Sequence, residues 1–261
     1  MTEAIYELRG DHVFATGFSR GPWDPNAQHG GAPAAILMRA MEALPDADPG
    51  LQLARVTYEL IRPVPLGELH LSAAVVRPGR RIQLLEASLS TPDGTEVVKA
   101  RALRVARSPV SAGEEPAPPP VGPHGLTADR SFGQDIEKYV GQGIEVRMAQ
   151  GHFYDRGPAF AWFRFGHPLI AGEQPSPLQR LVAAADFPNG ISTELSWEEY
   201  VFINPDLTVY VEREPQGEWI GLDAQTRVVE GGIGLAQAVL YDEHGRVGRS
   251  LQSLYVARRE G

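Results

Sequence analysis

The chain contains 261 residues, of which 43% are hydrophobic and 22% are charged, so it can fill the core of one large domain or two ordinary ones. Its net charge of -9 at pH 7 argues against broad binding to nucleic acids or anionic membranes, because both need a basic protein surface. The absence of cysteine excludes disulfides, thiolate metal sites and a cysteine nucleophile.

Signals for export, membrane insertion and cofactor binding are also missing. Residues 1–7 lack the basic start and apolar run of a signal peptide, and no run of about 18 apolar residues occurs. The seven histidines include no pair at the ligand spacing of a helical metal site. Neither a phosphate-binding glycine loop nor a Gly-x-Ser-x-Gly motif is present. We therefore expect a cytoplasmic protein with no metal, no cofactor and no membrane partner.

The first part of the chain predicts short strands, then one helix, then several antiparallel strands. Short strands are expected within 4–20, and the glycine and prolines of 21–26 predict a loop. A helix is expected over 33–44, because Pro33 suits the first helical position and apolar residues recur at helical spacing behind it. Strands are expected after it at 53–61, 67–77, 80–91 and 96–106, the last two joined by a Pro-Asp-Gly turn.

A segment rich in proline, alanine and glutamate follows at 108–123. Its prolines are incompatible with a helix or an inner strand, so it is typical of an exposed linker. We place the domain boundary here, with an N-terminal unit over 1–107, a linker over 108–127 and a C-terminal unit over 128–261.

The second part of the chain predicts a similar order of elements. Its helix is expected over 176–186, with Ser176 as N-cap and Pro177 at the first position, and with Pro188 and Gly190 ending it. Strands are expected at 144–152, 159–166, 194–203, 207–213, 218–227, 233–241 and 246–257.

The two parts align as an internal repeat. Residues 86–107 match 237–258 without a gap at an offset of 151, and seven of the 22 positions are identical, including the turn glycines Gly94 and Gly245. This alignment matches Arg101 of the first copy with Gln252 of the second. We predict an α+β fold made of two copies of one unit, each an antiparallel sheet curled around a central helix, with one working site per chain built from both copies.

The loop before the first helix carries the strongest local signal. Gly30 and Gly31 let another group approach the backbone closely, and the start of the helix offers free N–H groups with a partial positive charge. We expect His29, Gly30 and Gly31 to bind substrate, together with Asn26 of the same loop. A tight turn leading into a core helix, with His29 in a structural role, is the alternative explanation.

Four stretches together resemble the thioesterase-like proteins of the double hotdog superfamily, and in particular the type II (TesB-like) acyl-CoA thioesterases. They are residues 21–37 with the His-Gly-Gly turn, 184–190, 202–208, and 219–226 taken with Gln252. The resemblance covers nearly the whole chain outside the linker. It implies a double hotdog fold and hydrolysis of an acyl-CoA thioester.

The resemblance also implies an acid, a hydroxyl residue and a glutamine that hold the attacking water. Gln252 is similar to the family's glutamine, and Thr226 is the best match for the hydroxyl. For the acid there are two candidates, Asp186 near the end of the second helix and Glu194 beyond it. Apolar neighbours such as Ala185 and Phe187 favour partial burial of Asp186.

We therefore predict an acyl-CoA thioesterase that works by direct attack of water and assembles as a homodimer or higher homo-oligomer. A non-catalytic acyl- or CoA-binding protein of the same fold is the alternative. A hotdog dehydratase is a third possibility, but the sequence shows no hydratase-type histidine and acid motif.

Overall fold

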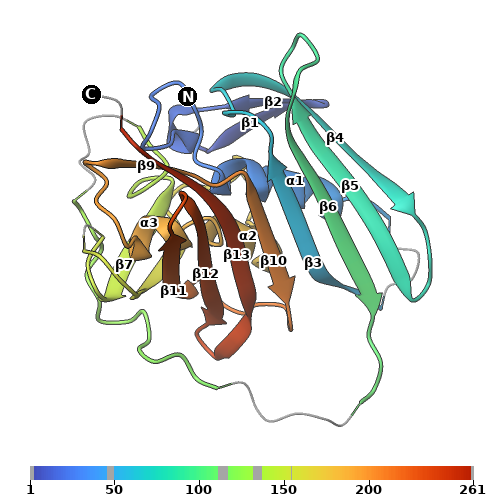
Figure 1. Ribbon diagram of the computed structural model, residues 1–261. Coiled ribbons are helices and arrows are strands. Elements are labelled where there is room, and N and C mark those ends of the chain that lie inside the picture. Colours follow the sequence, from blue (N-terminus) through green and yellow to red (C-terminus); the bar gives the residue numbers. More distant parts are fainter. Residues whose placement is uncertain (1–2, 46–49, 111–116, 132–136, 154, 260–261) are drawn as a thin grey trace.

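The computed structural model describes residues 3–45, 50–110, 117–131, 137–153 and 155–259 (Figure 1). The first part of the chain forms β1 (Tyr6–Arg9), β2 (His12–Ala15), a 3-10 turn (Gly17–Ser19), α1 (Gly31–Glu42), β3 (Leu51–Leu60), β4 (Gly67–Arg77), β5 (Ile82–Ser90) and β6 (Glu96–Ala106). The second part forms β7 (Ile144–Gln150), β8 (Ala159–Phe165), α2 (Pro177–Ala184), α3 (Pro188–Ser192), β9 (Tyr200–Ile203), β10 (Asp206–Val211), β11 (Ile220–Val229), β12 (Ile233–Asp242) and β13 (Gly245–Arg258).

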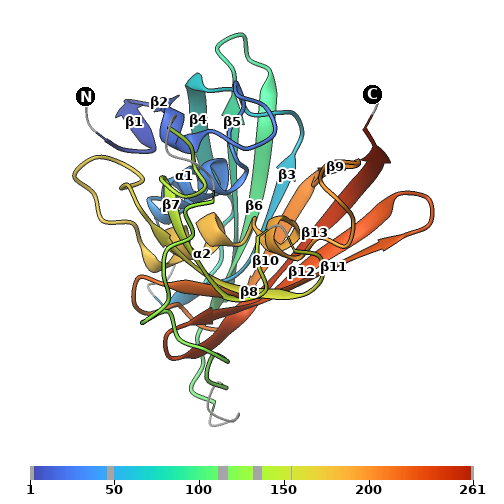
Figure 2. The same ribbon diagram turned by 90° about the vertical axis from the view of Figure 1, so that its left-hand side faces the viewer.

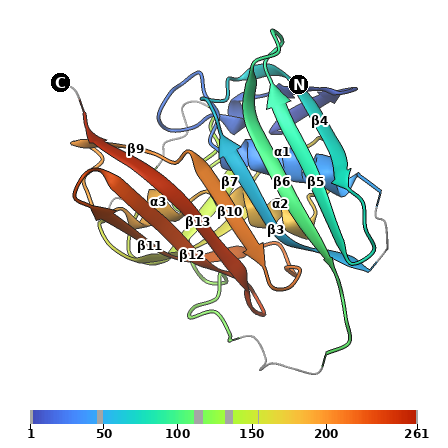
Figure 3. The same ribbon diagram turned by 45° about the vertical axis from the view of Figure 1, so that its right-hand side comes forward.

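The strands form one 13-stranded sheet, in which equivalent strands of the two halves follow the same order from each edge to the centre. From one edge to the other the order is β1-β2-β4-β5-β6-β3-β10-β13-β12-β11-β8-β7, with β9 paired to β13. Each strand of the first half thus has a counterpart at the same distance from the centre, where β3 and β10 run antiparallel (Figure 3). The predicted duplication is present in the topology.

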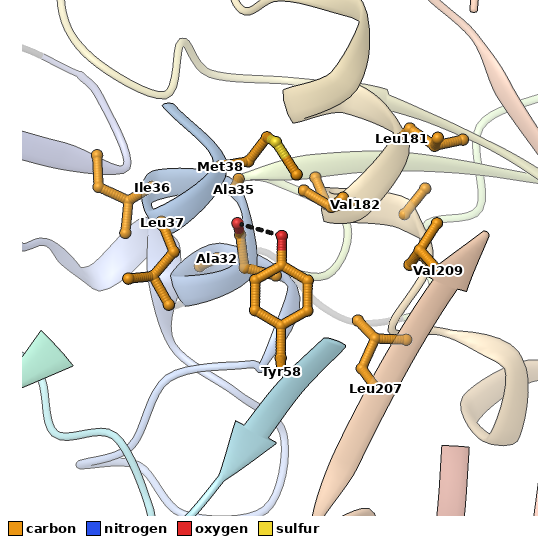
Figure 4. Packing of buried hydrophobic residues seen from close by; sticks show 14 of the residues in the cluster. Ala32, Ala35, Ile36, Leu37, Met38, Tyr58, Leu181, Val182, Leu207 and Val209 are labelled. Atoms are coloured by element: carbon orange, nitrogen blue, oxygen red, sulfur yellow. Dashed lines mark hydrogen bonds between the residues drawn. The ribbon is translucent and has the colours of Figure 1, made fainter. Parts of the chain in front are cut away.

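The sheet curls around α1 and α2, which lie side by side in its hollow (Figure 2). The first eight residues of α1, from Gly31 to Met38, are all buried, as the uncharged sequence of this stretch predicts. Figure 4 shows Met38 of α1 and Val182 of α2 in the same cluster as Leu207 and Val209 of β10. The Tyr58 hydroxyl donates to the Ala34 carbonyl oxygen at 3.1 Å, so the cluster satisfies this buried polar group.

The second helix differs from the sequence expectation. Ser176 caps α2 by accepting from the Gln179 N–H at 3.1 Å and Pro177 opens it, as predicted. However, α2 ends at Ala184, and Pro188 opens a further short helix, α3, because proline suits a first helical position as well as a stop. The strand expected over 194–203 is confined to Tyr200–Ile203, since 197–199 form a turn.

The proline-rich connection packs partly against the second half. Residues 111–116 of the expected linker lie outside the described residues. Beyond them, the carbonyl oxygens of Val121 and Pro123 accept hydrogen bonds from the Trp162 indole and the Arg147 guanidinium. The linker is therefore tied to β8 at Val121 and to β7 at Pro123.

Candidate active site at the start of α1

The first turn of α1 leaves two backbone N–H groups to point out of the helix. Gly30 is the N-cap and offers no side chain to bond them. The Ala32 N–H donates to the His29 carbonyl oxygen at 3.0 Å, the Ala34 N–H donates to that of Gly30 at 3.1 Å, and Pro33 has no N–H. Among the described residues the Gly30 N–H has no partner, and the Gly31 N–H meets Nδ1 of the His29 side chain at 3.1 Å, so this positive helix end suits an anion or a carbonyl oxygen.

Asp186, two residues beyond α2, faces this helix start. One carboxylate oxygen, Oδ1, accepts from the Gln252 side-chain amide at 2.7 Å and from that of Asn204 at 2.8 Å. The other, Oδ2, lies 3.1 Å from Nδ1 of His29. The side chain of Asp186 is only 5% exposed. Two amides therefore orient a buried carboxylate so that its second oxygen points at the tip of α1.

Both positions require glycine, because protein atoms occupy the space where a Cβ atom would lie. A Cβ on Gly30 would lie 2.7 Å from Oδ2 of Asp186, and a Cβ on Gly31 would lie 2.4 Å from the Ala183 carbonyl oxygen. Close approach at these positions was predicted for a bound molecule. In the structure, part of that space is taken by the carboxylate itself and by the end of α2.

His29 packs against two aromatic rings and contacts two polar groups. Its ring stacks on Phe187 at 4.4 Å and on Tyr139 at 5.0 Å between centroids, which holds the imidazole plane. Nδ1 lies 3.1 Å from both Oδ2 of Asp186 and the Gly31 nitrogen. A protonated Nδ1 donates to Asp186 and leaves the Gly31 N–H free; an unprotonated Nδ1 accepts from Gly31 instead.

Gln252 and Thr226 are both buried on the inner face of the sheet. The Gln252 amide nitrogen is bonded to Asp186, whereas its Oε1 has no hydrogen-bond partner in the described part of the chain. The Thr226 hydroxyl lies 3.0 Å from that of Ser192, which in turn donates to the Pro188 carbonyl oxygen. Thr226 therefore ties β11 to α3, and its hydrogen bond is not with Asp186.

The remaining predicted residues make contacts elsewhere. Glu194 is exposed, and its Oε2 accepts from the Val228 N–H at 2.7 Å at the end of β11. Asn26 is exposed in its loop, where its N–H donates to Asp24 and its carbonyl oxygen accepts from Leu66. The structure thus brings Asp186, Gln252, His29 and the two glycines together, and gives Glu194 and Asn26 other partners.

Asn204 is a member of the cluster that sequence reasoning did not nominate. It lies between β9 and β10, directly before Pro205, and its amide bonds the same oxygen of Asp186 as Gln252 does. The sequence did contain a signal for it, because Asn204 lies within 202–208, one of the four stretches that carry the family resemblance.

The opposite junction, where α2 starts against the end of α1, is built differently. Glu42 takes the place of Asp186, but its carboxylate accepts from the Ser176 hydroxyl and from the Gln179 amide at 2.7 Å each. Burial raises the pKa of the Glu42 carboxyl, and these hydrogen bonds partly oppose the shift. Here Ser176 caps the helix with its own side chain, and the acid bonds side chains at the helix start and not its backbone N–H groups.

The sheet register shows what replaces the amides there. Arg101 lies opposite Thr57 and Leu251 opposite Thr208, so the counterpart of Gln252 is Ala102 and not Arg101, as the ungapped alignment had placed it. The halves differ by one residue here because five residues separate the paired Ser90 and Glu96 in the first hairpin, whereas four separate the paired Tyr241 and Arg246 in the second. Ala102 lines a cavity of about 250 Å³ beside Glu42, with Met38, Leu53 and Leu178. This junction has an acid, but alanine stands where the other junction has Gln252.

Two units of curled sheet around a central helix, joined along β3 and β10, define a double hotdog protein. The chain belongs to the acyl-CoA thioesterase family: the family's N-terminal domain matches residues 19–105 and its C-terminal domain matches residues 112–256. The predicted fold and family are thereby confirmed. No curated protein matches the chain.

Solved structures show the same fold over the whole length. A hot dog-fold protein of unknown function from Alicyclobacillus acidocaldarius is 16% identical, with a TM-score of 0.74, and the match covers 99% of this chain and 97% of that one. The acyl-CoA thioesterase II TesB2 from Mycobacterium marinum is 16% identical, with a TM-score of 0.65 and coverage of 98% and 95%. The tesB protein of Mycobacterium avium subs paratuberculosis is 14% identical, with a TM-score of 0.67 and coverage of 97% and 96%. Within the described residues, no helix is both long and apolar enough to cross a membrane.

Proposed function

We propose that the chain hydrolyses an acyl-CoA thioester by direct attack of water at the junction of Asp186 with the start of α1. The observation that carries the proposal is the oriented carboxylate, whose Oδ2 faces a helix start that has no side-chain cap from its N-cap residue. Thioester hydrolysis needs a base for water and donors for the oxyanion that develops on the carbonyl oxygen. Both requirements can be met within this one cluster.

In the proposed reaction Asp186 Oδ2 accepts a proton from water while the water oxygen adds to the thioester carbon. Oε1 of Gln252 is buried and unbonded, so it can accept the second hydrogen of that water and fix its position. The Gly31 N–H donates a hydrogen bond to the developing oxyanion when Nδ1–H of His29 donates to Asp186. Collapse of the tetrahedral intermediate breaks the C–S bond, and the proton on Asp186 passes to the leaving thiolate. The products are a carboxylic acid and CoA.

Asp186 is favoured over Glu194 as the acid because it alone of the two contacts the helix start. Glu194 is exposed and its Oε2 is bonded to a backbone N–H of β11. We assign Thr226 a positioning role, since its hydroxyl bonds Ser192 and so fixes α3, the helix that follows Asp186. His29 and Gly30 complete the substrate-binding end of α1, with Asn26 shaping the loop that leads into it.

The test is release of free CoA thiol from a panel of acyl-CoAs of different chain length. Asp186→Asn is expected to lower kcat by about 10²–10⁴-fold, the usual contribution of a general base. Gln252→Ala is expected to cost about 10–150-fold, as loss of a hydrogen bond to a charged group costs about 1.5–3 kcal/mol. Asp93→Asn in an exposed turn and Gln237→Ala on the outer face of β12 are matched controls that should keep wild-type rates.

Two results would overturn the proposal. Turnover that survives Asp186→Asn but is lost in Glu194→Gln would move the acid to Glu194. Acyl-CoA binding by the wild-type chain without any thiol release would favour the non-catalytic alternative. Cytoplasmic location, homo-oligomer formation and the unit boundaries at 107 and 128 stay predictions.

A further inference from the structure

Two histidines that are far apart in the sequence meet on the outer face of the sheet. His12 of β2 and His70 of β4 are direct partners in the antiparallel register, and their ring centroids lie 4.1 Å apart. Their neighbours Val13 and Leu69 are fully buried, so the alternation of a strand turns both imidazoles away from the helices. The two histidines are 58 positions apart in the sequence, so only the pairing of β2 with β4 brings them together.

An aspartate completes a set of three possible metal ligands. Asp11 precedes β2, and its carbonyl oxygen is held by the Leu71 N–H at 2.9 Å. A carboxylate oxygen of Asp11 and one ring nitrogen from each histidine all lie within 4.8 Å of one another. The distance from Oδ1 of Asp11 to Nε2 of His12 is 3.7 Å. Two ligand atoms of a tetrahedral zinc ion lie about 3.4 Å apart, so the exposed Asp11 and the two half-buried histidines need only a small movement.

A fourth side chain fixes the orientation of His12. Oε1 of Glu68 lies 2.6 Å from Nδ1 of His12, so this nitrogen carries the proton and Nε2 keeps its lone pair. A carboxylate bonded to the far nitrogen of a ligating histidine is the usual support of a zinc-binding imidazole. The cluster thus has both the ligands and the group that orients one of them.

We propose that Asp11, His12 and His70 bind one Zn²⁺ ion, with water in the fourth position and Glu68 as the supporting carboxylate. Two imidazoles and one carboxylate suit zinc and related transition metals, whereas Mg²⁺ and Ca²⁺ require mostly oxygen ligands. The ion links the turn before β2 to β4. It therefore stabilises the edge of the sheet, where β1 also contacts the second half through the bond from the Tyr6 N–H to the Leu169 carbonyl oxygen.

The experiment is isothermal titration of the chelator-treated full chain with ZnCl₂. One ion per chain is expected, with a rise in Tm that grows with zinc concentration. His12→Ala and His70→Ala should abolish the binding, and Glu68→Gln should weaken it about 10–100-fold. His124→Ala is the matched control: His124 also lies 2.6 Å from a glutamate, Glu243, but it belongs to no such group of ligands among the described residues.

In EDTA each variant should have the same Tm as the wild type. A variant with a lower Tm in EDTA has lost stability for a reason other than zinc. Co²⁺ provides a second measurement, because the intensity of its visible absorption reports tetrahedral coordination by these ligands. Absence of zinc binding would overturn the proposal, and so would binding that survives His12→Ala and His70→Ala or binding that Mg²⁺ displaces at equal concentration. The result is independent of thioesterase activity.

Discussion

The hydroxyl groups of Thr57 and Thr208 lie 3.1 Å apart at the centre of the sheet, and their positions differ by 151 residues. The same offset aligns the two repeated hairpins in the sequence. In a symmetric dimer only a residue on the twofold axis meets its own copy. The pair therefore marks the axis that relates the two halves, and the chain has the architecture of a fused hotdog dimer.

The threonine pair should show measurable coupling between the halves. Thr57→Val and Thr208→Val each remove one partner of a half-buried hydrogen bond, so each should cost about 0.5–1.5 kcal/mol. The double variant should cost less than the sum, because the second substitution removes a hydroxyl that is already unpaired. Urea unfolding of the four proteins measures this cycle, and strictly additive losses would show that the two hydroxyls do not interact.

The sequence predicted the fold well because repetition and local signals agree. Ser176 and Pro177 mark the start of α2, and the glycines of the hairpin turns set the pairing of the strands around them. The register of β13 was harder to predict, since the connection between the paired Tyr241 and Arg246 is one residue shorter than that between Ser90 and Glu96. For that reason the ungapped alignment matched Gln252 with Arg101, whereas the strand register makes Ala102 its counterpart.

The candidate site was predictable only in part. The glycines and Asp186 belong to local motifs, so they could be named from the sequence. Asn204 reaches Asp186 from a separate segment, and only tertiary structure shows that contact. Thr226 was predicted from the family resemblance as the hydroxyl residue, and the structure shows its hydroxyl bonded to Ser192. The same limit applies to His12 and His70, which only the pairing of β2 with β4 brings together.

Alanine at the two glycines of α1 should separate activity from stability. In Gly30→Ala the new methyl group meets Oδ2 of Asp186, a side-chain end that can move, so the chain should fold normally and lose most thioesterase activity. In Gly31→Ala the methyl group meets the Ala183 carbonyl oxygen, which α2 holds in place, so overpacking should cost at least about 1–3 kcal/mol.

Thiol release and urea unfolding of both variants measure this contrast. Equal loss of stability in the two proteins would contradict it. Full activity in Gly30→Ala would also contradict it, because thioesterase activity would then not depend on the present position of the Asp186 carboxylate.

Asn204 should matter to the rate and little to substrate binding. Asn204→Ala removes one of the two amides on Oδ1 of Asp186, and the carboxylate loses part of its orientation. We expect kcat to fall about 10–150-fold, the cost of one hydrogen bond to a charged group, with KM nearly unchanged. Steady-state kinetics on one acyl-CoA test this. A rise in KM with kcat preserved would place Asn204 in substrate binding instead.

Asp242 should be the most important charged group for the stability of the second half. Its buried carboxylate accepts from both terminal nitrogens of Arg213 and from the N–H groups of Gln216, His244 and Gly245. Burial alone would raise its pKa, but the Arg213 pair and the backbone bonds hold it below the ordinary value. Breaking a buried pair costs about 3–5 kcal/mol, so Asp242→Asn should lower the free energy of unfolding by that order.

Thermal and urea unfolding measure the loss, with Asp223→Asn on the neighbouring β11 as the control. Asp223 is exposed and partial burial raises its pKa, so Asp223→Asn should not lower the free energy of unfolding. Similar losses in the two variants would mean that the Asp242 network does not hold the β12–β13 hairpin.

Glu42 should make the folded chain less stable as the pH rises, in contrast to most acids. Burial raises its folded-state pKa above the ordinary value of 4.5, so the folded chain holds this proton more tightly than the unfolded chain does. Below pH 4.5 the group is protonated in both states and carries no penalty. As the pH rises from 4.5 through the folded pKa, the penalty of the buried charge grows to its full value. Glu42→Gln should therefore gain stability relative to the wild type over this range.

Glu173→Gln provides a control of opposite sign. The hydrogen bond from Arg39 lowers the pKa of the partly exposed Glu173, so its ionised form stabilises the folded chain above pH 4.5 and that contribution is lost as the pH falls through the folded value. Urea unfolding at pH 4 and pH 8 gives both differences. A difference between Glu42→Gln and wild type that stays constant across this range, or follows the sign of Glu173→Gln, would show that the Glu42 carboxyl ionises freely in the folded chain.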